Sequence, residues 1–310
     1  MSGFHVDRSG RWSGGGGAVL ANLDLAERTS RTIGATATAG SIAIVPRNAP
    51  TRASVVLGPF VWMPQNALPW APPAPAERTL QLRLRAASEV MRARARAMVR
   101  ISGAIPPLRT GRPTSRVLHN VLDEGFEAAL PPAAPGHGAF VCAGSAHGYR
   151  NLVPLVRGFA RYRSTGGRTD LLLQTTPGSP SVEAALAEAA SAVPGLRVRA
   201  GADRRATLSL MAGSAGVVLP SSVEASPMTL LEAQALARPV ACSTIRAHDE
   251  LLGDCGSPRF DAAEESSVAA ALHALDERGG VAPHPLGDPA RRERERARWV
   301  ASLVEFLDEL

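Results

Sequence analysis

From residue 138 onward the chain alternates between short, mostly apolar runs and longer segments whose apolar residues recur at helical spacing. The short runs have the length of strands and read GAFVCAG, TDLLLQTT, LRVRAG, GVVLP and PVACS. The helical segments between them read YRNLVPLVRGFARYRSTG, SVEAALAEAASAV, RATLSLMAGS and PMTLLEAQALA. Strands without a polar face that alternate with helices are typical of a parallel sheet buried on both sides. The pattern predicts a doubly wound α/β domain.

The first part of the chain predicts a second and shorter domain of the same class. Apolar runs of strand length occupy 41–46, 54–62 and 116–122. Over 78–100 leucine, alanine and methionine recur at helical spacing while arginine fills most other positions, so we expect one amphipathic helix there.

The domain boundaries follow from breaks in this pattern. A proline-rich stretch, LPPAAPGHG, separates the two halves. We therefore expect a first domain over 1–134, a second over 135–285, and a terminal helix over 286–310 that packs back on the first domain.

Composition limits the class of protein. With 310 residues, 45% hydrophobic and 20% charged, the chain is long enough for two folded domains and is not typical of disorder. It contains no apolar run of the roughly 18 residues that a membrane span needs, and its first residues lack an apolar signal segment, so we expect a cytoplasmic protein. Three cysteines without metal-ligand spacing predict buried thiols in a reducing compartment.

Positive charge is concentrated in the first domain. All 34 basic residues are arginine; 1–134 holds 16 of them against 8 acids, a balance of +8, and 135–310 holds 18 against 20, a balance of −2. For the arginine-rich helix over 78–100 we expect a solvated surface, with peripheral contact to the inner face of an anionic membrane, or recognition of an acidic acceptor, as alternatives. Nucleic acid is not expected as a partner, because aromatic residues make up only 4% of the chain and none is interleaved with these arginines.

The stretch VEASPMTLLEA carries the first candidate site. It follows the strand GVVLP, and ligands of open parallel sheets bind beyond the carboxyl ends of the strands. Ser226 is a suitable helix cap and Pro227 a suitable first helical residue. The backbone N–H groups of Met228 and Thr229 then lack helical partners at the positive end of the helix dipole, which predicts an anion site.

Two glutamates flank this predicted anion site. If both carboxylates touched a phosphate they would repel it, so Glu224 and Glu232 are expected to accept hydrogen bonds from hydroxyl groups of the same ligand. Glu232 suits a ribose diol and Glu224 a sugar on the other side of the phosphates. Arg150, in the loop after FVCAG, supplies positive charge for a diphosphate. The predicted ligand is a nucleoside diphosphate sugar; the alternative is that these are ordinary surface charges.

A glycine-rich segment, SGGGG at 13–17, lies near the start of the chain. It is either a flexible linker or a loop whose backbone N–H groups, at Gly15 and Gly16, approach a phosphate or an acceptor.

Three stretches resemble the retaining glycosyltransferases of family 4, which have the GT-B fold of two Rossmann-like domains facing a cleft. VEASPMTLLEAQALARPVACS resembles the glutamate-pair signature of that family, FVCAGSAHGYRNLVPLVRGF its strand–loop–helix opening of the nucleotide domain, and RVLHNVLDEGF the segment that closes its first domain. The resemblance covers about 116–275.

This resemblance implies a function. Glu232 would hold the donor ribose, Glu224 the transferred sugar, and Arg150 with Ser145 the diphosphate. A hexosyl group would pass from a nucleotide sugar to a small-molecule or glycan acceptor with retention of configuration, without a metal or other cofactor. The first domain would then be the acceptor side and the second the donor side.

Two other functions remain open from the sequence. The same fold serves nucleotide-sugar epimerases and phosphorolytic carbohydrate enzymes, and a non-catalytic scaffold with a shortened first domain is the remaining alternative.

Overall fold

The computed structural model describes residues 4–6, 21–27, 42–46, 60–71, 78–108, 115–131, 138–201, 203–253, 255–279 and 281–310. The chain forms two compact units. Unit 1 comprises 1–125, 224–228 and 292–310, and unit 2 comprises 126–223 and 229–291. The end of the chain thus belongs to the same unit as its beginning.

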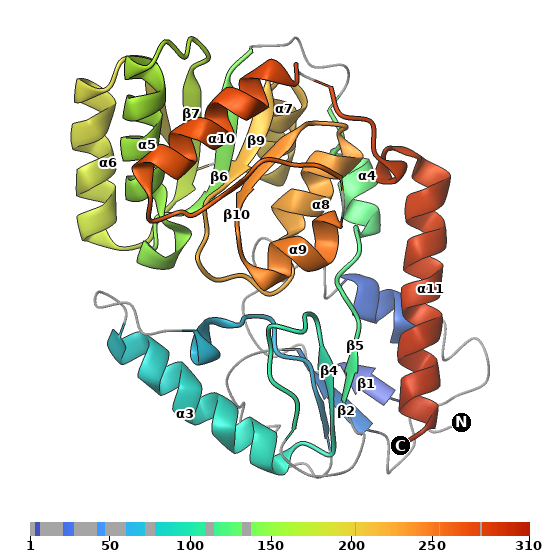
Figure 1. Ribbon diagram of the computed structural model, residues 1–310. Coiled ribbons are helices and arrows are strands. Elements are labelled where there is room, and N and C mark those ends of the chain that lie inside the picture. Colours follow the sequence, from blue (N-terminus) through green and yellow to red (C-terminus); the bar gives the residue numbers. More distant parts are fainter. Residues whose placement is uncertain are drawn as a thin grey trace. The chain divides into compact units, whose positions relative to one another are not determined.

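Unit 2 contains a six-stranded parallel sheet (Figure 1). Its strands are β6 (Phe140–Ser145), β7 (Leu171–Thr176), β8 (Leu196–Ala200), β9 (Gly216–Leu219), β10 (Val240–Ser243) and β11 (Arg259–Phe260). Their spatial order is β11-β10-β9-β6-β7-β8. The chain builds outward from β6 in one direction, then returns and builds outward from β9 in the other. The predicted doubly wound sheet is confirmed here, with its switch point between β6 and β9.

Helices cover both faces of this sheet, as the strand pattern predicted. They are α5 (Leu152–Ser164), α6 (Pro180–Ala192), α7 (Arg204–Ala212), α8 (Met228–Ala235), α9 (Arg246–Leu252) and α10 (Glu265–Glu277). A single-turn helix, η3 (Gly148–Arg150), precedes α5, and η4 (Pro285–Gly287) follows α10.

Alternate residues of each strand enter two separate cores. Phe140 and Cys142 pack with α5, α6 and α10, whereas Val141 between them packs with α7, α8 and α9. The central strands are mostly apolar because each successive side chain points to the opposite face of the sheet and both faces are covered, whereas the edge strand β8 carries Arg197 and Arg199.

Unit 1 holds a five-stranded parallel sheet of short strands. These are β1 (Phe4–Val6), β2 (Ile42–Val45), β3 (Phe60–Trp62), β4 (Ala97–Arg100) and β5 (Ser115–Val117), and they lie side by side in chain order. The described helices of this unit are a segment at 21–27, α3 (Arg78–Arg94), most of α11 (Pro289–Asp308) and the start of α4 (Glu124–Ala129), together with η1 (Leu68–Trp70).

The predicted helix over 78–100 is wrong at its end. The helix α3 stops at Arg94, and Ala97–Arg100 form the strand β4, in which Ala97, Met98 and Val99 are buried. Three consecutive apolar residues fit a strand covered on both faces, but Met98 also continues the helical spacing of the preceding residues, and this ambiguity misled the prediction.

From Arg292 onward the terminal helix α11 belongs to unit 1. Trp299, Leu303 and Phe306 bury one of its faces. Arg116 of β5 forms ion pairs of 2.7 Å with both Glu305 and Glu309 on the helix. None of the described helices is both long enough and apolar enough to cross a membrane.

One helix of unit 2 ends on a strained residue. After α8 the backbone of Ala237 has φ of 52°, in the left-handed region, and the N–H of Arg238 donates to the carbonyl of Ala233 at 2.9 Å. This turn normally carries glycine, because a Cβ in the left-handed conformation collides with the neighbouring carbonyl oxygen.

We therefore expect Ala237→Gly to stabilise unit 2 by about 0.5–1 kcal/mol, since relief of strain outweighs the added freedom of the unfolded chain. The change is measured by unfolding the protein in urea and monitoring hydrogen–deuterium exchange in the peptides that cover β9 and β10. Ala235→Gly, at the last residue of α8, is the matched control and should destabilise, because glycine forms helix less readily than alanine. Destabilisation by both substitutions would contradict the assignment of strain to Ala237.

Candidate functional site

The switch point of unit 2 brings together three loops that leave adjacent strands at their carboxyl ends. One loop runs from β6 through η3 to α5, the second from β9 to α8, and the third from β10 to α9. In doubly wound sheets this is where ligands bind, because the loops on either side of the reversal diverge and leave room between them.

Arg150 lies in the first of these loops and reaches the second. Its Nη1 donates to Oγ of Ser221 at 3.3 Å, and its guanidinium carbon lies 5.2 Å from the ring centre of Tyr149. The aliphatic part of the side chain passes over Gly144 near the end of β6, where an added Cβ would be 3.9 Å from Cδ. The structure thus brings the predicted phosphate-binding cation to the switch point.

Further hydrogen bonds join the same two loops. Nδ2 of Asn151 donates to the carbonyl of Pro220 at 3.1 Å. The backbone N–H and the hydroxyl of Ser222 both donate to the carbonyl of Tyr149, at 2.9 and 3.1 Å. Asn151 has φ of 51°, a conformation that asparagine tolerates better than most residues. The loops after β6 and β9 are therefore held as one polar surface.

Glu232 lies on α8 and is 7% exposed. Its Oε1 accepts a hydrogen bond of 2.9 Å from Nε of Arg204, the first residue of α7. Asp203 caps that helix by accepting from the N–H of Ala206 at 2.7 Å. A buried carboxylate needs such a partner to remain ionised, and the ion pair with Arg204 also fixes its orientation. No pattern in the sequence indicated Arg204.

The other predicted site residues take different positions. Ser145 is the last residue of β6, and Thr229 lies in the first turn of α8, which begins at Met228. Glu224 is half-buried in the segment 224–228. Gly15 and Gly16 lie outside the described residues.

Ser226 makes a contact that its predicted capping role did not include. Its Oγ accepts a hydrogen bond of 3.2 Å from the backbone N–H of Asn120. Both residues belong to unit 1.

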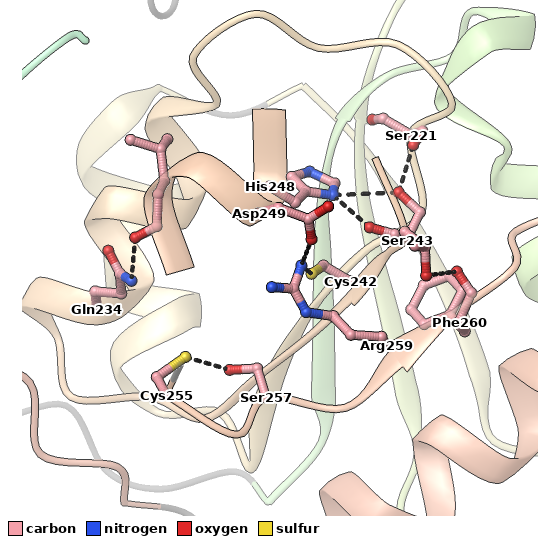
Figure 2. A network of polar contacts seen from close by, with 12 residues as sticks. Ser221, Gln234, Cys242, Ser243, His248, Asp249, Cys255, Ser257, Arg259 and Phe260 are labelled. Carbon is pink, nitrogen blue, oxygen red and sulfur yellow. Dashed lines mark hydrogen bonds and ion pairs between the residues drawn. The ribbon is translucent and has the colours of Figure 1, made fainter. Parts of the chain in front are cut away.

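A buried polar network lies behind the loop after β9 (Figure 2). Oγ of Ser243, at the end of β10, donates to the carbonyl of Ser221 at 2.5 Å. The ring Nδ1 of His248 is 2.9 Å from the carbonyl of Ser243. A carbonyl oxygen only accepts, so Nδ1 carries the proton and the neutral ring has its lone pair on Nε2.

An ion pair and the thiol of Cys242 adjoin this network. Arg259 binds Asp249 at 2.8 Å, and its Nη1 donates to Sγ of Cys242 at 3.3 Å. Burial raises the pKa of the Cys242 thiol to about 11 and that of Cys142 to about 12, so both thiols are protonated at neutral pH. The expectation of buried thiols holds for these two cysteines, whereas Cys255 is exposed. Among the described residues, no group of three or more His, Cys, Asp or Glu side chains is arranged to hold a metal ion.

The pKa of His248 gives unit 2 a specific dependence on pH. Burial lowers this pKa from 6.5 to about 4, and the repulsion of Arg259 and Arg150 adds to the effect. The unfolded chain binds a proton at His248 below about pH 6.5, whereas the folded chain does so only near pH 4.

The unfolding free energy of unit 2 should therefore fall by about 3 kcal/mol between pH 7 and pH 4 on account of this one side chain. Urea unfolding at a series of pH values, read from exchange in β9 and β10, measures the slope. His248→Leu should flatten the slope, and His147→Leu, which removes an imidazole from the loop after β6, should leave it steep. An unchanged slope in His248→Leu would show that other groups cause it.

The sequence matches no model of a known protein family and no curated protein. The fold does match solved structures. An α,α-trehalose-phosphate synthase (UDP-forming) from Burkholderia vietnamiensis aligns with a TM-score of 0.63 at 14% identity, covering 97% of this chain and 81% of that chain. The N-terminal domain of Candida albicans trehalose-6-phosphate phosphatase aligns with a TM-score of 0.60 at 12% identity, covering 93% and 75%.

A ligand-free structure of OtsA is also similar, with a TM-score of 0.58 at 11% identity and coverage of 94% of this chain and 74% of that chain. At these identities the likeness establishes the fold. Both units of this chain are α/β with parallel sheets, as in the GT-B structures that it resembles.

Proposed function

We propose that this protein is a glycosyltransferase that takes its sugar from a nucleoside diphosphate donor. The observation that carries the proposal is the switch point of unit 2, where Arg150 is bound to the loop that leads into α8 while the buried carboxylate of Glu232 lies on α8 itself. Positive charge beside one loop and a fixed hydrogen-bond acceptor on the next helix suit a diphosphate joined to a ribose.

The diphosphate is proposed to bind between the guanidinium group of Arg150 and the N-terminus of α8. The backbone N–H groups of Met228 and Thr229 belong to the first turn of that helix and have no partners within it, so they face an anion favourably. Ser145, at the end of β6, would add a hydroxyl donor. Each hydrogen bond to a charged phosphate oxygen contributes roughly 1.5–3 kcal/mol.

Glu232 is proposed to bind the ribose of the donor. An ionised carboxylate has about four acceptor positions, so the ion pair with Arg204 is compatible with additional hydrogen bonds from a vicinal diol. Because Arg204 orients the carboxylate before the ligand arrives, binding needs little further ordering of the side chain.

Glu224 is proposed to hold hydroxyl groups of the transferred sugar, since it follows directly on the loop 220–223. In the reaction the bond from the anomeric carbon to the phosphate oxygen breaks as a bond to the acceptor oxygen forms on the same face. The acceptor's proton passes to the departing phosphate. No side chain then serves as a nucleophile, and the configuration is retained. Arg150 and the helix N–H groups stabilise the negative charge of the departing diphosphate, which a metal ion would otherwise stabilise.

The similarity to a UDP-forming trehalose-phosphate synthase supports this class of reaction through the shared fold and makes UDP a natural first ligand to test. The acceptor is proposed to be a small molecule or a glycan.

A thermal-shift panel of UDP, GDP, ADP and dTDP, followed by calorimetry on the one that stabilises the chain most, tests the proposal. Glu232→Ala should weaken binding of that nucleotide by about 10- to 100-fold, because one or two hydrogen bonds to a buried charge are lost. Glu224→Ala should leave nucleotide affinity within about twofold while lowering turnover of the corresponding sugar donor by at least about 100-fold.

Glu188→Ala on α6, an exposed glutamate, is the matched control and should change neither quantity. A wild-type chain that binds none of the four nucleotides would overturn the proposed function. Binding with formation of an isomerised nucleotide sugar, in the absence of acceptor, would identify an epimerase instead.

We also propose that the first domain, the proposed acceptor side, binds an anionic membrane surface through α3. Three of the four most exposed large apolar side chains among the described residues lie on this one helix: Leu80, Leu82 and Val90, at 46, 58 and 48% exposure. Arginines flank them, and the one acid of the helix, Glu89, is paired with Arg92 at 2.9 Å. Exposed apolar side chains among guanidinium groups suit the boundary between acyl chains and anionic headgroups.

The chain should therefore co-sediment with vesicles of phosphatidylcholine containing phosphatidylglycerol, and much less with phosphatidylcholine alone. The double variant Leu82→Ser, Val90→Ser should reduce the bound fraction by about tenfold, because it removes most of the apolar area that enters the bilayer. Val281→Ser, at the fourth exposed apolar residue, lies off this helix and should bind like the wild type. Equal loss in both variants would contradict a role for α3.

A further inference from the structure

His248 and Ser243 form a buried polar pair that the proposed reaction does not use. Both side chains lie behind the loop after β9, with exposures of 0% and 2% (Figure 2). An apolar residue would fill this space without the cost of removing an imidazole from water, so the polar pair needs an explanation in its contacts.

The hydrogen bonds of this pair have a defined direction. The Nδ1–H of His248 donates to the carbonyl of Ser243 at 2.9 Å and lies 3.2 Å from its Oγ. Oγ of Ser243 in turn donates to the carbonyl of Ser221 at 2.5 Å. Both carbonyl oxygens accept only, so the direction of donation runs from the histidine toward the loop after β9.

Ser221 joins this pair to the candidate site. Its carbonyl accepts from Ser243, and its Oγ accepts from Nη1 of Arg150 at 3.3 Å. A change in the backbone position of Ser221 therefore moves the hydroxyl that holds the guanidinium group. The contacts from Asn151 and Ser222 hold the outer side of the same loop, whereas Ser243 holds its buried side.

We propose that Ser243 and His248 are positioning residues that hold Arg150, through Ser221, in the orientation that receives the diphosphate. The link to the diphosphate rests on the proposed function, whereas the effect on Arg150 does not. His248 orients the serine at the end of β10, the serine fixes the loop, and the loop fixes the arginine. No bond is made or broken by either residue.

Burial favours the neutral form of His248, and so do the charges of Arg259 and Arg150, whereas the charge of Asp249 opposes them. Asp249 is its neighbour on α9, Arg259 comes from β11, and Arg150 comes from the loop after β6. A neutral ring with its proton on Nδ1 keeps the donor that Ser243 needs, and adds no positive charge beside the arginine that it helps to position.

The first test observes Arg150 without any ligand. In ¹⁵N-labelled full-length protein, the Nε–Hε resonance of Arg150, assigned by its loss in Arg150→Ala, should shift or broaden in Ser243→Ala and in His248→Leu. His248→Asn, whose amide N–H takes the place of Nδ1–H, should restore the wild-type resonance. An Arg150 resonance that is unchanged in Ser243→Ala would overturn the proposal.

The second test measures binding of inorganic pyrophosphate by calorimetry. Ser243→Ala should weaken binding by about tenfold, the effect of one misplaced charge-assisted hydrogen bond. In an Arg150→Ala background the same substitution should have less than about a twofold further effect, because the serine acts through the arginine. Equal weakening in both backgrounds would show a general structural role and overturn the proposal.

The two proposals fail in different ways. A wild-type chain that binds neither pyrophosphate nor any nucleoside diphosphate overturns the proposed function, and the Arg150 resonance still decides the positioning role. If His248→Leu does not fold, Ser243→Ala alone decides, since it removes one hydroxyl and leaves the carbonyl that accepts from His248.

Discussion

The reversal of strand order between β6 and β9 is the constraint on which the candidate site depends. At that point the chain sends one loop toward each side of the sheet, and the carboxyl ends of two neighbouring strands are left with diverging polar backbones. Such loops are stable near the core only if their carbonyl and N–H groups find partners. Asn151 and Ser222 supply those partners across the gap, Ser243 supplies one from behind, and Arg150 binds the hydroxyl of Ser221. The candidate site therefore lies where the strand order of the sheet reverses, and the hydrogen bonds that satisfy the two diverging loops also shape it.

All 34 lysine and arginine positions of the chain are arginine, and arginine makes two of the side-chain contacts of the candidate site. Arg204 holds the buried carboxylate of Glu232, and Arg150 extends from one loop to a hydroxyl of the next. The guanidinium group has five donors in a rigid plane and stays charged when half-buried, so one side chain satisfies a protein acceptor and still presents donors to an anion. A lysine at position 150 would place one compact charge in the loop without that fork of donors.

The disagreements between sequence and structure have a common origin. Residues 97–100 read as the end of a helix because Met98 continues its spacing, yet they pair with β3 and β5 as the strand β4. Local spacing was ambiguous there, and pairing with strands distant in sequence decided the outcome. Ser226, predicted as a helix cap, also accepts from the N–H of Asn120, which lies more than a hundred residues earlier and which no local pattern indicates. No sequence pattern indicated His248, because a single histidine in a short helix belongs to no recurring motif. The available signal was Ser243, a serine that ends an otherwise apolar strand.

The sequence by itself determined the class of fold and indicated two residues of the candidate site, Arg150 and Glu232. Runs apolar on both faces require a covered parallel sheet, and the order of strands and helices places Arg150 and Glu232 after strands, where ligands of such sheets bind. It could not determine that β6 and β9 are neighbours, that Arg204 pairs with Glu232, or that Ser221 links the arginine to a buried histidine. Those facts depend on contacts between residues far apart in the chain. The energies of such contacts depend on the packing of the whole unit, and they produce no recurring pattern in the sequence.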